Sequence, residues 1–181
     1  MDIDIEKELE QLKKKVAKLE KNRQDQLSIA IVSGDMDKVL ATMIISLAAA
    51  ASDTKVKLFF SFWALSALRD PKKSVKGKNF ISTMFGWMLP KGRNKLKLSK
   101  MNMMGMGPLM IKGLMRKQNV MSLDEMFKQA AELGIEIIVC EMSMNLMGFK
   151  KEEMIDYPNL TYAGAGTFIA EASQSSVQFF I

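Results

Sequence analysis

One side chain dominates the chemistry that this sequence could perform. Cys140 is the single cysteine of the 181 residues, and the chain contains no histidine. Without histidine, no Ser–His or Cys–His pair can form, and a zinc site that uses histidine is excluded. Any covalent chemistry of this protein therefore falls first to the Cys140 thiol.

The position of Cys140 along the chain suits a nucleophile. It closes the apolar run 135–140 and is followed by Glu141 and Ser143. A cysteine between a strand and the first turn of a helix can place its sulfur near free backbone N–H groups, which stabilise the thiolate. Ser143 could donate a further hydrogen bond, whereas Glu141 would raise the pKa of Cys140 if its carboxylate pointed inward. A buried and inert cysteine is the structural alternative.

Methionine is the second chemical feature of the chain. Fourteen of the seventeen methionines lie between Met84 and Met154, with Met-x-Met pairs at 101/103, 104/106 and 142/144. Thioethers beside a thiolate would suit Cu(I). More often, methionine fills irregular cores or forms compliant contact surfaces. We therefore expect no metal site.

Phosphate-binding signals are missing. The glycine-rich stretches 105–107 and 164–166 lack G-x-G-x-x-G spacing, and no G-K-[ST] loop occurs. The aromatic residues in the basic part of the chain fall outside any stacking motif for bases. The sequence thus predicts no nucleotide cofactor and no nucleic-acid partner.

The formal charge of +6 is unevenly distributed. Residues 69–118 carry thirteen Lys or Arg and the single acid Asp70. Such a segment favours an anionic ligand, an acidic protein partner or a membrane surface, although a solvated lysine-rich face is the simpler explanation. The longest apolar stretches are too short to span a bilayer, and the charged start of the chain has no signal-peptide core. We expect a cytoplasmic protein that contacts a membrane at most from its surface.

The chain divides into a short leader and a larger domain. An apolar residue recurs at heptad spacing through Ile5, Leu9, Leu12, Val16 and Leu19. This seam predicts a coiled-coil-like helix over 1–24 that pairs with a copy of itself or docks on the domain. The domain itself is expected to span 27–181.

From residue 27 onward, strand and helix patterns alternate. Strands are predicted at 27–32, 56–60, 135–140, 160–163 and 177–181. Helices are predicted at 38–52, 80–89, 109–116, 123–133, 151–155 and 167–173, the fifth of these being short. This order predicts an α/β fold in which helices cover both faces of a parallel sheet. Ligands of such sheets bind beyond the carboxyl ends of the strands, where Cys140 lies.

A basic, methionine-rich insert at about 72–117 interrupts this alternation. It contains a turn at 90–92, an extended piece at 95–98 and the Gly/Met loop 101–108. An insertion of this length in a compact α/β unit is usually functional or an assembly surface.

Three separated motifs resemble one family. They are Phe59-Phe60-Ser61-Phe62-Trp63, the run 95–103 (KLKLSKMNM), and Cys140-Glu141-Met142-Ser143-Met144 with Met147-Gly148. Together they resemble the DsrE/DsrF-like family over nearly all of 27–181, in the branch often labelled a peroxiredoxin family. Ile138-Val139-Cys140 lacks the arginine and the Pro-Thr context of a peroxiredoxin cysteine.

The resemblance implies a flavodoxin-like sheet of about five strands in a homo-oligomer. It also implies a cofactor-free sulfur carrier or sulfurtransferase that holds sulfane sulfur on Cys140 as a persulfide or thiosulfonate. Rhodanese-type or small sulfur-carrier proteins would be its partners, and anionic sulfur compounds its ligands. The expected substrate-binding residues are Ser143, Trp63, Asn102, Lys97 and Lys100. The alternative is a non-catalytic assembly protein in which Cys140 is only buried.

Overall fold

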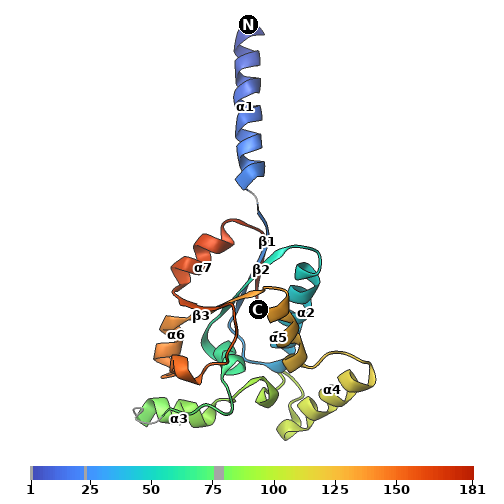
Figure 1. The fold of residues 1–181 in the computed structure, drawn as a ribbon, viewed down its shortest axis with the longest axis vertical. Coiled ribbons are helices and arrows are strands. Elements are labelled where there is room, and N and C mark those ends of the chain that lie inside the picture. Colours follow the sequence, from blue (N-terminus) through green and yellow to red (C-terminus); the bar gives the residue numbers. More distant parts are fainter. Residues whose placement is uncertain (1, 23, 76–79) are drawn as a thin grey trace.

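The computed structural model describes residues 2–22, 24–75 and 80–181. Five strands form one parallel sheet in the order β4-β3-β2-β1-β5 (Figure 1). The strands are β1 (Gln24–Ile31), β2 (Lys55–Phe60), β3 (Glu136–Cys140), β4 (Leu160–Ala163) and β5 (Ser175–Phe180). The predicted flavodoxin-like parallel sheet is therefore confirmed.

Helices lie on both faces of this sheet, as the alternating pattern predicted. On one face lie α2 (Met36–Ala50) and α5 (Leu123–Glu132), and on the other α6 (Glu141–Leu146) and α7 (Ala165–Ala172) (Figure 1). The insert contributes α3 (Phe80–Met88) and α4 (Met106–Lys117). Four 3-10 turns complete the chain: η1 (Phe62–Leu68), η2 (Arg93–Lys95), η3 (Met103–Gly105) and η4 (Lys151–Glu153).

The two faces of the sheet carry cores of unequal size. Side chains alternate along β3, so that Ile137 and Val139 join the large cluster with α2 and α5. Ile138 and Cys140 point to the opposite face, where a small cluster contains Ala30 and Phe59. The cysteine thus lies on the thinner side of the domain.

Several local signals fold as the sequence predicts. Ser122 caps α5: its hydroxyl accepts from the Glu125 N–H at 3.3 Å, and the Glu125 carboxylate accepts from the Ser122 N–H at 2.7 Å. The Ser122 N–H and the Ser122 hydroxyl (2.8 Å) both donate to the Glu125 carboxylate and lower its pKa. Gly134, just after the helix, adopts φ 73°, as expected of a residue that ends a helix in the left-handed region.

Other boundaries differ from the prediction because tertiary contacts extend or shorten the elements. β1 begins at Gln24 rather than 27, since the buried Gln26 amide donates to Ser175 Oγ (2.9 Å) and the Glu171 carbonyl (3.1 Å). α4 begins at Met106 rather than 109. The helix predicted at 151–155 is only the turn η4, and the piece predicted at 95–98 as extended begins within η2. Short polar segments carry too weak a periodicity to fix such limits.

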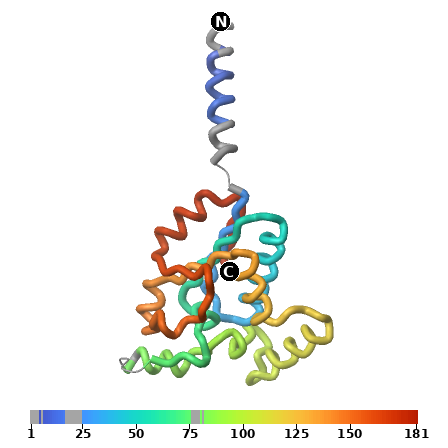
Figure 2. The backbone as a smooth tube through the Cα atoms, viewed as in Figure 1, coloured from blue at the N-terminus to red at the C-terminus, as the bar shows by residue number. Residues whose placement is uncertain are grey.

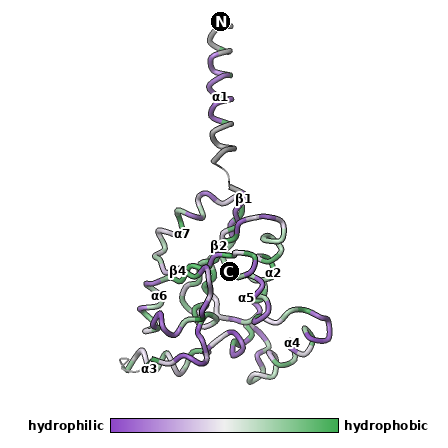
Figure 3. The backbone as a smooth tube through the Cα atoms, viewed as in Figure 1, coloured by the Kyte–Doolittle hydropathy of each residue, from purple (hydrophilic) through white to green (hydrophobic). Residues whose placement is uncertain are grey.

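The leader forms the helix α1 (Asp2–Asn22), as predicted, and leads into β1 (Figure 2). Hydrophilic residues dominate it, whereas hydrophobic residues gather in α2 and the strands (Figure 3). Along α1, the seam residues Ile5, Leu9, Leu12 and Val16 are exposed, and Leu19 lies outside the residues whose side chains are described. The helix therefore presents an apolar seam that this single chain leaves uncovered.

A buried arginine connects the insert to the domain. Arg69 is only 3% exposed and pairs with the equally buried Glu153 at 3.6 Å. Its guanidinium also donates to the carbonyls of Gly86 (3.0 Å) and Leu89 (3.3 Å) and lies over the Phe149 ring. These contacts hold the end of α3 against the body of the protein.

No helix among the described residues is both long and apolar enough to cross a bilayer.

Candidate functional site

The sheet places Cys140 at the carboxyl edge, where its neighbours come from several elements. Cys140 is the last residue of β3 and pairs in register with Ala163 of β4. It is also the residue that precedes α6, with an extended backbone (φ −68°, ψ 107°). The chain turns directly from strand to helix at the thiol, as the sequence predicts.

A chain of three polar side chains converges on the sulfur. Ser143 Oγ donates to Cys140 Sγ at 3.3 Å, and Ser61 Oγ lies 2.8 Å from Ser143 Oγ. A serine hydroxyl has one proton, so when Ser143 gives its proton to the sulfur, Ser61 must donate to Ser143. Both serines are buried, which removes competing water. The arrangement stabilises negative charge on the sulfur.

The balance of burial and hydrogen bonding favours the thiolate. Burial by itself would raise the pKa of Cys140. The side chain and backbone N–H of Ser143, the Ser61 hydroxyl and the Met142 N–H outweigh it, so that the pKa lies below its ordinary value. A thiolate is the nucleophilic form of cysteine, so these hydrogen bonds make the sulfur more nucleophilic than burial by itself would.

The carboxylate next to the thiol is engaged elsewhere. Glu141 Oε1 accepts from Lys151 Nζ at 2.9 Å, in an ion pair at the surface. The repulsion that an inward-pointing Glu141 would exert on the thiolate is thereby avoided.

The sulfur is covered in this conformation. Cys140 is 2% exposed and belongs to a small apolar cluster against which Ala163 and Phe168 pack. The Phe168 ring stacks on Phe59 with centroids 4.9 Å apart. Reaction with any partner thus requires local opening near the start of α7. Gly164 and Gly166 leave open space at the same place, since no atom lies within 4 Å of a Cβ built on either.

Trp63 and Lys97, two of the expected substrate-binding residues, line a separate cleft. The cleft has a volume of about 250 Å³, and Ser33, Gly34 and Leu89 also contribute to it. Gly34 is needed there, because a Cβ on it would lie 2.4 Å from the Trp63 carbonyl oxygen. Cys140 does not line this cleft. Ser61 links the cleft to the Cys140 site, because it contacts Ser143 and lies two residues before Trp63 in the chain.

Asn102 and Lys100, the remaining two, lie in the loop before η3. Asn102 Oδ1 accepts from the Leu98 N–H at 3.3 Å, and its carbonyl accepts from the N–H groups of Gly105 (2.8 Å) and Gly107 (3.2 Å). Its visible role is to shape the loop. Lys100 is exposed. The structure therefore places Ser143 at the thiol and Trp63 and Lys97 in the separate cleft, and substrate binding by the expected residues stays a prediction.

Sequence reasoning assigned no role to Ser61 and Phe168. Ser61 follows the last residue of β2, the strand beside β3, so it was bound to lie near Cys140 once the strand order was known. Phe168 belongs to α7, which contacts β1 and β5, and its stacking on Phe59 of β2 has no signal in the sequence. For Ser61 the useful signal was its place at a strand end.

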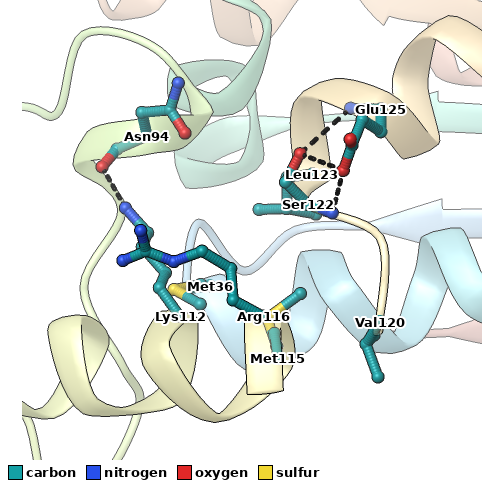
Figure 4. Close-up of a pocket in the computed structure, with 9 residues that line it drawn as sticks. All are labelled: Met36, Asn94, Lys112, Met115, Arg116, Val120, Ser122, Leu123 and Glu125. Carbon is teal, nitrogen blue, oxygen red and sulfur yellow. Dashed lines mark hydrogen bonds between the residues drawn. The ribbon is translucent and has the colours of Figure 1, made fainter. Parts of the chain in front are cut away.

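A second cavity lies on the other face, between α4 and α5 (Figure 4). It measures about 230 Å³, and Met36, Met115 and Leu123 contribute apolar walls. Lys112 Nζ, on the α4 side, donates to the Asn94 carbonyl at 2.6 Å. Lys112 and Ser122 line this cavity but are engaged in hydrogen bonds, Lys112 with the Asn94 carbonyl and Ser122 with Glu125. The cavity results from the packing of α4 on the domain.

Among the described residues, no three His, Cys, Asp or Glu side chains gather as a metal site.

Replacing Ser143 tests the hydrogen bond to the thiolate. In Ser143→Ala the pKa of Cys140 is expected to rise, because the thiolate loses its donor. Alkylation by iodoacetamide at pH 7 should slow by about tenfold, and the midpoint of its rate profile should move to higher pH. The matched control Ser173→Ala, whose hydroxyl binds only its own helix at Ala170, should leave the profile unchanged. If the dependence of the alkylation rate on pH is unchanged in Ser143→Ala, Ser143 does not stabilise the Cys140 thiolate.

Replacing Phe168 tests how the thiol is covered. Phe168→Ala removes the ring stacked on Phe59 and should loosen the start of α7, so that Cys140 alkylates faster by at least about tenfold. Ile169→Ala changes the neighbouring side chain, which is 63% exposed, and should leave the rate unaltered. Equal rates in the two variants would place the opening elsewhere.

Comparison with known proteins places this geometry in a family. The model of the DsrE/DsrF/DrsH-like family matches residues 23–180. Uncharacterized protein YrkE of Bacillus subtilis is 42% identical over 154 residues, covering 85% of this chain and 95% of that protein. Sulfur carrier protein DsrE2 of Allochromatium vinosum is 30% identical over 165 residues, covering 87% of this chain and 99% of that protein. The chain therefore belongs to the DsrE/DsrF/DrsH-like family.

Proposed function

We propose that this protein transfers sulfur, holding a sulfane sulfur atom on Cys140 and passing it to an acceptor protein. The observation that carries this proposal is the hydrogen-bond chain from Ser61 through Ser143 to the Cys140 sulfur. Family membership and the similarity to a protein named as a sulfur carrier support the same chemistry. The single cysteine suits a carrier. A second thiol in the chain could attack the Cys140 persulfide, form an intramolecular disulfide and release the sulfur, and this sequence has no second thiol.

Loading is a nucleophilic displacement on sulfur. The Cys140 thiolate attacks the outer sulfur of a donor persulfide, a new S–S bond forms, and the donor thiolate leaves and takes up a proton. With thiosulfate as donor, the bond that breaks is the one between the two sulfur atoms, and sulfite leaves. The donors are themselves anions, and Lys97 and Lys100 would raise their concentration nearby.

Delivery reverses this step with a different partner. An acceptor thiolate attacks the outer sulfur of the Cys140 persulfide, and the Cys140 thiolate leaves. The donors from Ser143 and the backbone stabilise that leaving thiolate, so the same groups assist both steps. No net oxidation occurs and no cofactor is consumed. Rhodanese-type proteins and small sulfur carriers, which present persulfides or thiols of their own, are the partners that we propose.

The test is to follow one sulfur atom onto the protein and off it. Reduced protein is incubated with polysulfide or with thiosulfate, freed of the donor, and weighed by intact mass spectrometry. We expect the mass of one added sulfur, carried as a persulfide, which cyanide or a small acceptor thiol removes. A chain that gains no such mass from any donor, or whose adduct no thiol removes, would refute sulfur transfer.

Burial of the thiol favours a second candidate, a non-catalytic assembly protein with a structural cysteine. Cys140 is 2% exposed, as an inert core cysteine would be. Under this alternative, Cys140 should react with alkylating reagents only after denaturation. Under sulfur transfer, it should react in the native state, at a rate that rises when the cover near the start of α7 is loosened.

We also propose that the protein is a homo-oligomer and that α1 contributes to it. The apolar seam of α1 is exposed in the single chain, and a helix of this length with so narrow a seam gains stability by pairing. Leu9→Lys with Leu12→Lys should lower the mass measured by light scattering, whereas Lys13→Gln off the seam should not. If the double variant has the same mass in solution as the unaltered protein, α1 does not contribute to oligomerisation.

A further inference from the structure

The insert carries two helices whose apolar stripes face away from the protein. In α3, Phe80, Met84, Trp87 and Met88 follow i, i+4, i+7, i+8 spacing and all are exposed, Phe80 by 84% and Trp87 by 87%. A stripe of this kind normally faces a core. Here it faces solvent.

The same holds for α4. Met106, Leu109, Met110 and Leu114 lie on one side of the helix and are exposed, Leu109 by 69%. The opposite side is the one that packs, through the buried Met115 and the Lys112 bond to Asn94. The apolar stripe is therefore free while the helix itself is anchored.

Both helices lie at the same end of the molecule, opposite α1 (Figure 1). We define the α3–α4 surface by the two stripes, which are formed by Phe80, Met84, Trp87, Met88, Met106, Leu109, Met110 and Leu114. Exposed apolar area on this scale marks an interaction site on a protein. The insert also exposes cations, among them Lys95, Lys97, Lys100, Arg116 and Lys117.

The charge decides between occupants. Of the thirteen Lys or Arg in residues 69–118, those ion-paired with acids elsewhere in the domain include Arg69, Lys73 and Arg93. The exposed Lys95, Lys97, Lys100, Arg116 and Lys117 remain, so a second copy docking on this surface would bring these like charges together. An anionic bilayer can bind both kinds of side chain on this surface. Its phosphate groups would pair with the cations, and its apolar layer would bury the two stripes. Aromatic side chains such as Trp87 prefer the depth of the lipid headgroups. Neither helix is long enough to span, so both would lie in the plane of the interface.

We propose that the α3–α4 surface docks this protein on an anionic membrane, with the two stripes inserted at the headgroup level. The surface lies close to the thiol-bearing elements, since Ser82 of α3 packs against Gly148, two residues beyond α6. Docking would thus bring the Cys140 side of the sheet to the bilayer. This proposal is independent of sulfur transfer, because its test involves no sulfur chemistry.

The full-length protein is mixed with vesicles of equal parts phosphatidylglycerol and phosphatidylcholine, or of phosphatidylcholine alone, and sedimented. We expect the protein to pellet with the anionic vesicles and to be released by salt. In a Trp63→Phe background, Trp87 fluorescence should shift to the blue on binding. Equal pelleting with both vesicle types, or none with either, would overturn the proposal, the second result in favour of an acidic protein partner.

Matched variants separate the apolar and ionic contributions. Trp87→Ser with Leu109→Ser should lower partitioning by at least about tenfold, while Phe180→Ser, equally apolar and 78% exposed on β5, should not. Arg116→Gln with Lys117→Gln should lower partitioning to the anionic vesicles by about fivefold per charge removed. The control Lys128→Gln with Lys55→Gln should leave partitioning unchanged. Binding that survives the double serine change would refute insertion. A lower oligomer mass of that variant without lipid would assign the surface to a second copy.

Discussion

Cys140→Ser is expected to abolish sulfur loading completely. A serine hydroxyl is not ionised at neutral pH and forms no stable bond to sulfane sulfur, so neither polysulfide nor thiosulfate should add mass to the variant. Because the chain has no other cysteine, no second residue can take over the role. The measurement is intact mass before and after cyanide treatment.

The control for this variant is Ser143→Ala, which keeps the thiol but weakens its hydrogen bonding. Ser143→Ala should still acquire the sulfur atom, only more slowly, whereas Cys140→Ser should never do so. Since serine nearly matches cysteine in size, the buried site should remain folded, and circular dichroism with thermal unfolding verifies this. A cyanide-labile adduct on Cys140→Ser would show that Cys140 is not the carrier.

Arg69→Met is expected to cause the largest loss of stability among single changes considered for this chain. The substitution removes the Arg69 guanidinium from the buried Glu153 carboxylate and removes the donors to Gly86 and Leu89. Breaking a buried ion pair by removing one partner costs about 3–5 kcal/mol of unfolding free energy. Denaturant titration followed by circular dichroism measures this loss.

Two further variants make the stability prediction specific. Arg69→Met with Glu153→Met removes both charges and should recover part of the lost stability. Lys73→Met breaks an ion pair with Asp156, whose side chain is 90% exposed, and should cost less than about 1 kcal/mol. If Arg69→Met cost no more than Lys73→Met, the buried pair would have no special part in anchoring α3.

The local signals in the sequence were sufficient for the fold class. Continuous apolar runs at 27–32 and 135–140 are typical of strands buried on both faces, and the helix stripes between strands require a parallel sheet. The capping box at Ser122 and the glycine at 134 fixed one helix almost to the residue. These predictions succeed because each depends on contacts between residues close in the chain.

The less accurate boundaries have the opposite cause. β1 extends back to Gln24 because Gln26 finds partners on Ser175 and Glu171, roughly a hundred and fifty residues away. Likewise, no sequence signal indicated that Trp63 and Lys97 line one cleft, where the turn after β2 brings Trp63 against Gly34. Side-chain direction in such turns depends on packing that spacing does not encode.

By itself the sequence determined the candidate atom for covalent chemistry: one thiol, no histidine, and a position at the end of an apolar strand followed by a helix start. It also determined the concentration of positive charge in the insert. Only the tertiary structure decided what surrounds that thiol. The order β4-β3-β2-β1-β5 brings Ser61 beside Ser143, and α7 brings Phe168 over the sulfur. These contacts join residues distant in the chain, and they exist only once the sheet has formed.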